Sequence, residues 1–221
     1  MALILLVRHG QNEWVKEKRL AGWTPNVHLN SEGRQEVKAL ASRLSSLPVK
    51  MIYSSPLERC IETAEILAEP NIVPIETNEN LGEVRFGKWE GKKLKKLARK
   101  KRKWHLVQHY PSRFRFPGGE SFSEVQTRAV KAIEDFSRLH TKEVISVVSH
   151  ADVIKLVLAH YLGMHIDLFQ RIAVSPASLS ILALSENGSV HVVRINDSGP
   201  IKLPPREEED SDTMVDPEKD V

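Results

Sequence analysis

Arginine, histidine and glutamate residues follow several short apolar runs of this sequence, at the points where predicted strands end. Arg8 and His9 follow the first run, Arg59 follows the second, and His150 follows a later one. Glu83 lies in a loop between the second run and the later one. Because ligands of open α/β sheets bind outside the carboxyl ends of the strands, we expect these five side chains to meet at that edge of a sheet.

The chemistry of such a group is that of phosphate. Two arginines and two histidines produce a positive potential and offer several N–H donors, which suits a tetrahedral dianion. The planar guanidinium of arginine holds two oxygens at once and stays charged at any working pH. An imidazole with one ring nitrogen held by a backbone acceptor can attack phosphorus with the other, and a carboxyl can protonate the departing alkoxide. The sequence contains no HExxH or CxxC motif, so we expect phosphoryl transfer without a metal or other cofactor.

Two of these five residues, His150 and Arg59, also have an ordinary structural explanation. His150 taken alone would be interpreted as a structural histidine. Arg59 could pair with Glu62 or Glu65 on its own helix. Cys60 is expected to pack beneath the site, although the neighbouring Arg59 makes a lowered thiol pKa conceivable. The other seven histidines lie away from any strand-end arginine and are assigned to surface or core: His28, His105, His109, His140, His160, His165 and His191.

The elements that must position the five residues can be predicted from apolar patterns. The runs at 2–7, 50–54 and 144–149 are typical of buried parallel strands. The runs at 179–184 and 190–195 flank a turn, ENGS, and indicate a hairpin.

Helical patterns lie between these runs. They are predicted to start at Ser31 as an N-cap, at Pro56 as the first helical residue, and at Ser121 and Ala151. The alternation of strands and helices predicts an α/β fold, namely a three-layer α/β/α sandwich with a mostly parallel, Rossmann-like central sheet and a small helical cap.

Composition and charge define the rest of the chain. The 221 residues, 41% of them hydrophobic, suffice for one domain, which we place at 1–199 with a cap insertion at about 92–117. From residue 200 onward there are three basic and eight acidic residues, so 200–221 carries −5 and is predicted to be a disordered acidic tail. The total of +3 therefore leaves +8 on the body.

Location and partners follow from the same composition. The opening MALILLV lacks a basic n-region and a cleavage site, and no apolar stretch is long enough to cross a membrane. The single cysteine gives no reason to expect an oxidising compartment, so we expect a soluble cytoplasmic protein without a membrane partner. The sequence does not decide whether the protein forms a homodimer.

A basic run, KKLKKLARKKRKW at residues 92–104, falls in the expected cap. If helical, this run is basic nearly all round. We favour a solvent-exposed charged face over a nucleic-acid site, because no aromatic interleaving or binding motif accompanies it. An intermediate hypothesis is that Arg113, Arg115 and some of the lysines favour substrates with additional negative charge.

An ordered set of motifs resembles the histidine phosphatase superfamily, which includes the phosphoglycerate mutases. The resemblance covers about residues 3–195. The motifs are RHGQNEW at 8–14, RLAGWTPNVHLNSEGRQ at 19–35, YSSPLERCIETAEIL at 53–67, LGEVRFGKWEG at 81–91, GGES at 118–121 and VVSHADVI at 147–154.

The resemblance implies a role for each of the five residues. His9 would be the nucleophile that forms a phosphohistidine, Arg8, Arg59 and His150 would hold the phosphoryl oxygens, and Glu83 would be the general acid. Substrate contacts are implied for Arg8, Asn12, Ala21, Gly22, Arg59, Glu83 and Ala151. The partner that we expect is a small phosphorylated metabolite.

Two positions depart from the family pattern. Val15 stands where members commonly have a phosphate-contacting asparagine, so one amide donor is lost. We hypothesise that Asn12 restores it. Ala151 in SHAD replaces a common glycine, and its backbone N–H at a helix N-terminus can still face phosphate.

The resemblance leaves three activities to compare. The stretch FGKWEG at 86–91 resembles the phosphatase branch more than the mutase branch, which carries a longer insertion before GGES. We therefore predict a metal-independent phosphomonoester hydrolase, with phosphoglycerate mutase-type transfer as the alternative. A non-catalytic phosphate-binding module is disfavoured because His9, Glu83 and His150 are all present.

Overall fold

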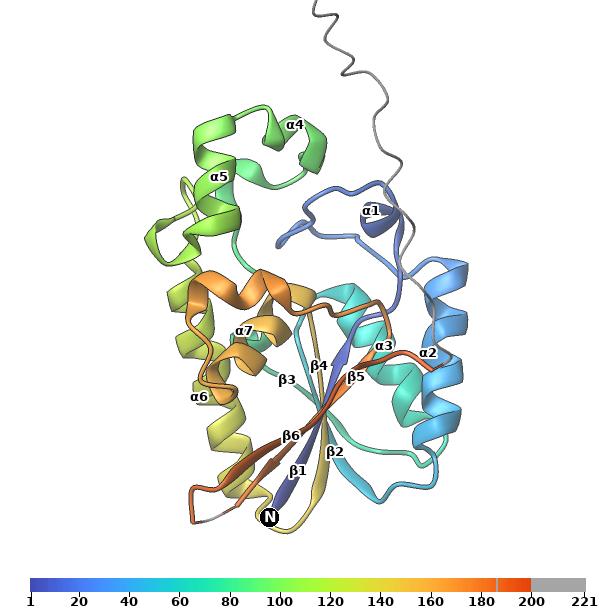
Figure 1. Cartoon of the computed structure of the whole chain (residues 1–221). Helices are drawn as coiled ribbons and strands as arrows, with labels where there is room; N and C mark the ends of the chain where they lie inside the picture. Colours follow the sequence, from blue (N-terminus) through green and yellow to red (C-terminus); the bar gives the residue numbers. More distant parts are fainter. Residues whose placement is uncertain (186, 200–221) are drawn as a thin grey trace, which may run out of the picture.

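The computed structural model describes residues 1–185 and 187–199, and a six-stranded sheet lies at the centre of this part of the chain (Figure 1). The strand order is β3-β2-β4-β1-β5-β6. The first four of these are mutually parallel, β5 runs antiparallel to β1, and β6 runs antiparallel to β5. The strands are β1 (Ala2–Arg8), β2 (Val49–Ser54), β3 (Ile75–Thr77), β4 (Val144–Ser149), β5 (Leu179–Leu184) and β6 (Val190–Asp197).

The prediction of a mostly parallel sheet with a terminal hairpin is confirmed. One strand, β3, was not predicted. It has three residues, all exposed, so it shows neither an apolar run nor an alternating pattern.

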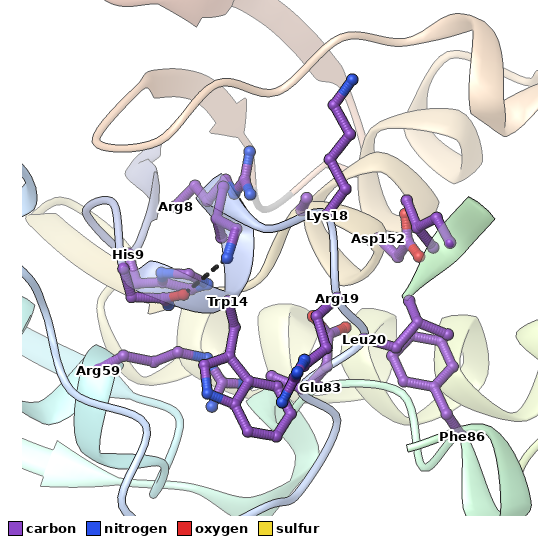
Figure 2. Close-up of a pocket in the computed structure, with 15 residues that line it drawn as sticks. Arg8, His9, Trp14, Lys18, Arg19, Leu20, Arg59, Glu83, Phe86 and Asp152 are labelled. Carbon is purple, nitrogen blue, oxygen red and sulfur yellow. Dashed lines mark hydrogen bonds between the residues drawn. The ribbon is translucent and has the colours of Figure 1, made fainter. Parts of the chain in front are cut away.

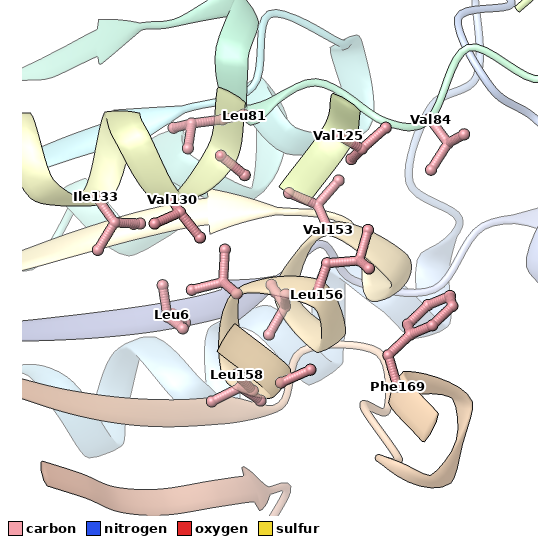
Figure 3. Close-up of a cluster of buried hydrophobic side chains, with 14 of the residues drawn as sticks. Leu6, Leu81, Val84, Val125, Val130, Ile133, Val153, Leu156, Leu158 and Phe169 are labelled. Atoms are coloured by element: carbon pink, nitrogen blue, oxygen red, sulfur yellow. The ribbon is translucent and has the colours of Figure 1, made fainter. Parts of the chain in front are cut away.

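Helices cover both faces of the sheet (Figure 1). The helices α2 (Ser31–Leu44) and α3 (Glu58–Ala68) pack together on one face, and α6 (Phe122–Leu139) and α7 (Ala151–Tyr161) pack together on the other. Leu5 and Val7 of β1 belong to the core on the α3 side, while Ile4 and Leu6 belong to the core beneath α6 and α7 (Figure 3). The first strand is therefore apolar without alternation because both of its faces are buried.

One predicted N-cap is wrong by one residue, and one predicted helix start is wrong by two. The N-cap of α2 is Asn30, not Ser31, because the Asn30 side-chain oxygen accepts the Gly33 N–H at 2.8 Å. The helix α3 starts at Glu58 rather than at Pro56. Ser55 N–H still donates to Val148 O at 2.9 Å, so the chain needs two more residues to leave the sheet. The starts at Ser121, which forms a capping box, and at Ala151 are confirmed.

The cap segment, residues 92–117, lies over the carboxyl ends of the parallel strands (Figure 1). It contains α4 (Leu94–Ala98), α5 (Lys101–His109) and the 3₁₀ helix η3 (Pro111–Arg113). The basic run is not basic all round: Leu97 is buried, and the Trp104 ring stacks on Trp89 with centroids 6.5 Å apart. Because lysine and arginine are so numerous in the run, the sequence gives little sign of this apolar side.

Four short helices complete the described part of the chain: α1 (Glu13–Lys16), η1 (Glu79–Leu81), η2 (Gly87–Trp89) and η4 (Ile166–Arg171). Among the described residues, no helix is both long and apolar enough to cross a membrane. The predicted acidic tail, 200–221, lies outside those residues.

Candidate active site

The five residues singled out in the sequence meet at the carboxyl edge of the sheet. Arg8 ends β1 and His9 follows it, Arg59 lies in the first turn of α3, Glu83 follows η1, and His150 is the N-cap of α7. The ring centroids of the two histidines are 5.3 Å apart. His150 Nδ1 lies 3.3 Å from Arg59 Nη2 and 3.7 Å from Glu83 Oε2.

A pocket of about 240 Å³ opens beside these groups (Figure 2). Four of the five line it, whereas His150 is fully buried and does not. The complete lining is Arg8, His9, Asn12, Trp14, Val15, Lys18, Arg19, Leu20, Ala21, Arg59, Glu83, Phe86, Leu94, Ala151 and Asp152.

His9 is held in the form that a nucleophile requires. The residue is only 3% exposed, and Nδ1 lies 2.8 Å from the carbonyl oxygen of Gly10. A carbonyl can only accept, so Nδ1 carries the proton and Nε2 keeps its lone pair. Burial, and then the charges of Arg59 and Arg8, hold the His9 pKa well below its ordinary value. The imidazole is therefore neutral across the neutral pH range.

The loop that carries His9 is fixed by close backbone contact with α2. A Cβ on Gly10 would lie 2.6 Å from Gly33 O, and a Cβ on Gly33 would lie 2.0 Å from Gln11 O. Only glycine allows this approach. Gly10 N–H also donates to the Thr63 hydroxyl at 3.2 Å, which ties the loop to α3. The two glycines thus place the imidazole against the arginines.

The two arginines are oriented by backbone carbonyls. Arg8 Nη1 donates to Val174 O at 2.7 Å, and Arg59 Nη2 donates to Gly22 O at 2.9 Å. Arg59 is 1% exposed and does not pair with Glu62, which instead accepts from His28 and Arg34. The alternative that Arg59 pairs with Glu62 along its own helix is therefore wrong.

Several buried N–H donors of the pocket lack an acceptor. Within the described residues, Arg8 Nε, Arg59 Nη1 and Asn12 Nδ2 are buried and have no hydrogen-bond partner. Burying such groups without an acceptor costs free energy, more so when they are charged. Their convergence on one pocket is the arrangement expected of an anion site.

Glu83 is set up to hold a proton near neutral pH. Burial, and then the charge of Asp152, raise its pKa to about 7. Its Oε1 accepts the Val84 N–H at 3.0 Å, while Trp23 Nε1 and Arg128 Nη2 donate to its backbone carbonyl at 2.6 and 3.0 Å. The carboxyl is thus positioned by its own backbone and two neighbours.

Sequence reasoning missed Asp152, Trp23 and Arg128. A signal existed for the first two, because Asp152 stands in SHAD and Trp23 in AGW, but neither type suggests proton transfer by itself. Arg128 lies in the middle of α6, far from any strand end, so nothing in its surroundings distinguishes it.

His150 is enclosed by polar neighbours rather than by solvent. Its Nε2 lies 2.8 Å from Ser55 Oγ, and Arg59 can only donate to its Nδ1, so the proton lies on Nε2. Its pKa is lowered by burial and then by the charge of Arg59. Cys60 lies beneath it, and burial raises the pKa of its thiol to about 12. The idea of a lowered thiol pKa is therefore wrong, because desolvation outweighs the Arg59 charge.

The remaining predicted substrate contacts divide into two groups. Asn12, Ala21 and Ala151 line the pocket, whereas Gly22 does not, and it contributes the carbonyl that holds Arg59. Arg113 and Arg115 do not line it either, and Arg115 forms an ion pair with Glu124. Besides Arg8 and Arg59, the cations that line the pocket are Lys18 and Arg19.

This geometry defines a class: an α/β protein whose pocket combines a neutral, buried histidine with arginine donors that are unpartnered among the described residues, an arrangement suited to phosphate esters. Residues 4–198 match the model of the histidine phosphatase superfamily (branch 1), and the chain belongs to that family. The resemblance stated from the motifs is confirmed.

Three similar proteins show the range of the family. Phosphoserine phosphatase 1 of Hydrogenobacter thermophilus is 29% identical over 89% of this chain and 92% of its own length. A 2,3-bisphosphoglycerate-dependent phosphoglycerate mutase of Thermoplasma acidophilum is 25% identical over 82% of this chain and 87% of its own. The solved structure of Bacillus stearothermophilus YhfR has a TM-score of 0.84 and 29% identity, covering 89% of this chain and 98% of that one. The prediction of a histidine phosphatase enzyme is confirmed at the level of the enzyme class.

Proposed function

We propose that this chain hydrolyses phosphomonoesters of small metabolites through a phosphohistidine on His9, with Glu83 as general acid and base. One observation carries the proposal: a neutral His9, with Nε2 free, lies in the pocket into which the buried donors of Arg8, Asn12 and Arg59 converge without partners. A phosphoryl group in that pocket supplies the missing acceptors and places phosphorus beside the nucleophile.

The reaction then proceeds in two displacements. His9 Nε2 attacks phosphorus, the P–O ester bond breaks, and the neutral Glu83 carboxyl gives its proton to the departing alkoxide. Water next attacks the phosphohistidine, the Glu83 carboxylate takes the water's proton, and the P–N bond breaks. Inorganic phosphate leaves, and both residues return to their starting forms. A Glu83 pKa of about 7 suits both directions of transfer.

Asn12 takes part by supplying the amide donor that Val15 does not provide. Its Oδ1 accepts the Val15 N–H at 2.9 Å and thereby caps α1. A backbone N–H can pair only with the amide oxygen, so the NH₂ group is fixed on the other side, where Nδ2 is buried, unpartnered and part of a residue that lines the pocket. We assign this NH₂ group to a phosphoryl oxygen.

The Asn12 assignment is tested by two variants that differ in the cap. Serine retains an oxygen that can cap α1 but lacks the NH₂ group, whereas alanine removes both. A hydrogen bond to a charged group is worth about 1.5–3 kcal/mol, so the inhibition constant of inorganic phosphate should rise about 10- to 100-fold in Asn12→Ser and in Asn12→Ala. Phosphate inhibition that is unchanged in Asn12→Ser would remove Asn12 from the phosphate site.

Hydrolysis is distinguished from mutase transfer by a substrate panel. Phosphomonoesters and 3-phosphoglycerate are assayed with the wild type, His9→Ala and His28→Ala, whose exposed histidine pairs with Glu62. We expect the wild type and His28→Ala to release phosphate and His9→Ala to release none. We also expect an acid-labile phosphoenzyme to form in the wild type but not in His9→Ala. Phosphate release by folded His9→Ala would refute the phosphohistidine mechanism. Interconversion of phosphoglycerates faster than their hydrolysis would show that the protein is a mutase. Residence in the cytoplasm and a homodimer stay predictions.

A further inference from the structure

A second cavity, of about 290 Å³, adjoins the phosphate pocket beneath the cap segment. We call it the chamber. Its walls are mainly aromatic and aliphatic: Trp89, Trp104, Val107, Phe116 and Phe122 all line it. None of these residues belongs to the proposed phosphoryl-transfer machinery, so that reaction by itself does not account for the cavity.

The chamber and the phosphate pocket share part of their lining. Leu20, Phe86, Leu94 and Asp152 line both cavities. Figure 2 shows Leu20, Phe86 and Asp152 on the side of the pocket away from His9 and Arg8. A phosphoryl group held by the arginines therefore has the chamber on the side toward which the rest of an ester can extend.

The apolar wall is preformed by packing among aromatic rings. Trp89 is 5.4 Å from Phe116 and stacks on Trp104 at 6.5 Å, and Phe116 lies 5.3 Å from Phe122, all as centroid distances. Trp89, Phe116 and Phe122 are buried within the main core. A ligand that enters the chamber meets an apolar surface that is already formed and can bury its own apolar atoms there.

The polar side of the chamber is close to neutral in charge. Lys155 Nζ lies 3.5 Å from Asp152 Oδ1 and 3.2 Å from Gln170 Oε1. The ammonium is thus matched by a carboxylate and an amide. A carboxylate or a second phosphate on the leaving group would therefore meet no uncompensated cation in the chamber. A leaving group with an apolar body and one polar group would instead contact the apolar wall with its body and the polar side chains with that group.

We propose that the chamber binds the alcohol part of the substrate, so that the enzyme prefers phosphomonoesters of bulky aliphatic or aromatic alcohols to those of small polar acids such as phosphoserine and 3-phosphoglycerate. This proposal rests on the proposed function. The preference arises because the shared lining, Leu20, Phe86 and Leu94, joins a charged site for the phosphoryl group to an apolar site for the leaving group.

The test uses straight-chain primary alkyl phosphates, ethyl through hexyl, whose leaving groups have nearly the same basicity. Each buried methylene contributes about fourfold to kcat/KM, so hexyl phosphate should exceed ethyl phosphate by on the order of 100-fold. Phosphoserine should fall below butyl phosphate. A kcat/KM that does not change with chain length, or a phosphoserine value above that of hexyl phosphate, would overturn the proposal without any variant.

Two neighbouring variants on α5 locate the effect. Gln108 lines the chamber, and Gln108→Trp should fill it and bring the hexyl-to-ethyl ratio of kcat/KM close to one. His109 is the next residue of the helix and is exposed, so His109→Trp should keep the wild-type ratio. A full ratio in folded Gln108→Trp would place the alkyl chain elsewhere. Absence of hydrolysis of every ester would refute the proposed function, whereas active hydrolysis with a flat series would refute this inference alone.

Discussion

Replacing Glu83 by glutamine separates proton transfer from the structural contacts of this residue. The carboxylate oxygen that accepts the Val84 N–H has an equivalent in the glutamine carbonyl. The donors Trp23 and Arg128 contact the backbone carbonyl of residue 83, which the substitution leaves in place. Glu83→Gln should therefore fold with the loop in position and lack only a proton that can be given to the leaving group.

The size of the effect follows from the pKa of about 7, which arises from burial and from the Asp152 charge. In the wild type, kcat/KM for an alkyl phosphate should fall tenfold per pH unit above about 7, because the first displacement needs the protonated carboxyl. A positioned general acid contributes roughly 10²–10⁴-fold, which is the loss expected in Glu83→Gln at pH 6. His9 adds no limb there, since its pKa lies well below its ordinary value.

The assay is kcat/KM from pH 5 to 9 with ethyl phosphate and with 4-nitrophenyl phosphate. The nitrophenolate leaves without a proton, so the variant should lose less than tenfold on that ester. The substrate phosphate titrates near pH 6 and adds the same rising limb to wild type and variant. Equal losses on both esters, or a falling limb near pH 7 that persists in Glu83→Gln, would refute the assignment of the acid.

Stability provides an independent check of the same pKa. The folded state favours neutral Glu83, so its contribution is fully present below the ordinary value of 4.5 and is lost as the pH rises through about 7. Glutamine does not titrate. The variant should therefore gain free energy of unfolding relative to the wild type between pH 4.5 and pH 8, by on the order of 3 kcal/mol. Unfolding in urea at both pH values measures this difference, and a constant difference would contradict the raised pKa.

Two further outcomes test the frame of the site. Gly33→Ala should lose at least about 2 kcal/mol of unfolding free energy, together with activity, because its Cβ would lie 2.0 Å from Gln11 O. The control is the exposed neighbour, since Glu32→Ala should change the unfolding free energy by less than about 0.5 kcal/mol. Equal stability of the two variants in urea would exclude the close contact. Cys60, whose burial raises its pKa to about 12, should resist iodoacetamide at pH 8 until the protein is denatured, and rapid labelling of the native protein, followed by mass spectrometry, would show that the thiol is accessible.

The convergence of the five residues could be predicted because it depends on a rule of topology. Arg8 and His150 lie at the carboxyl ends of β1 and β4, which are adjacent and parallel. Arg59 and Glu83 follow β2 and its neighbour β3. Polar residues that end neighbouring parallel strands meet at one edge of the sheet, so the order of apolar runs sufficed for the two arginines and the two histidines. Glu83 follows β3, whose exposed residues give no strand pattern in the sequence.

The states of these residues could not be predicted in the same way. The raised pKa of Glu83 depends first on its burial and then on the charge of Asp152, which lies in the first turn of α7. The chamber depends on the direction in which α5 turns Trp104 and Val107, and a lysine-rich run gives no indication of that direction. Side chains that shift a pKa by desolvation, or that line a cavity, leave only a weak pattern in the sequence. Many apolar or charged residues could fill either role, so the residue type alone does not identify them.

Asn12 and Val15 line the phosphate pocket, which shares part of its lining with the chamber. Asn12 caps α1 with its oxygen, and its NH₂ group has no partner within the described residues. If that group binds phosphate as proposed, the residue at position 15 need not be a donor. Valine there lines the same pocket as Leu20, Phe86 and Leu94, which continue into the chamber. If the proposed function is correct, an amide at position 12 instead of position 15 retains the contact to the phosphoryl group. The valine at position 15 then makes the pocket wall apolar there. The departure from the family pattern is then a change in which leaving group is accepted rather than a loss of phosphate binding.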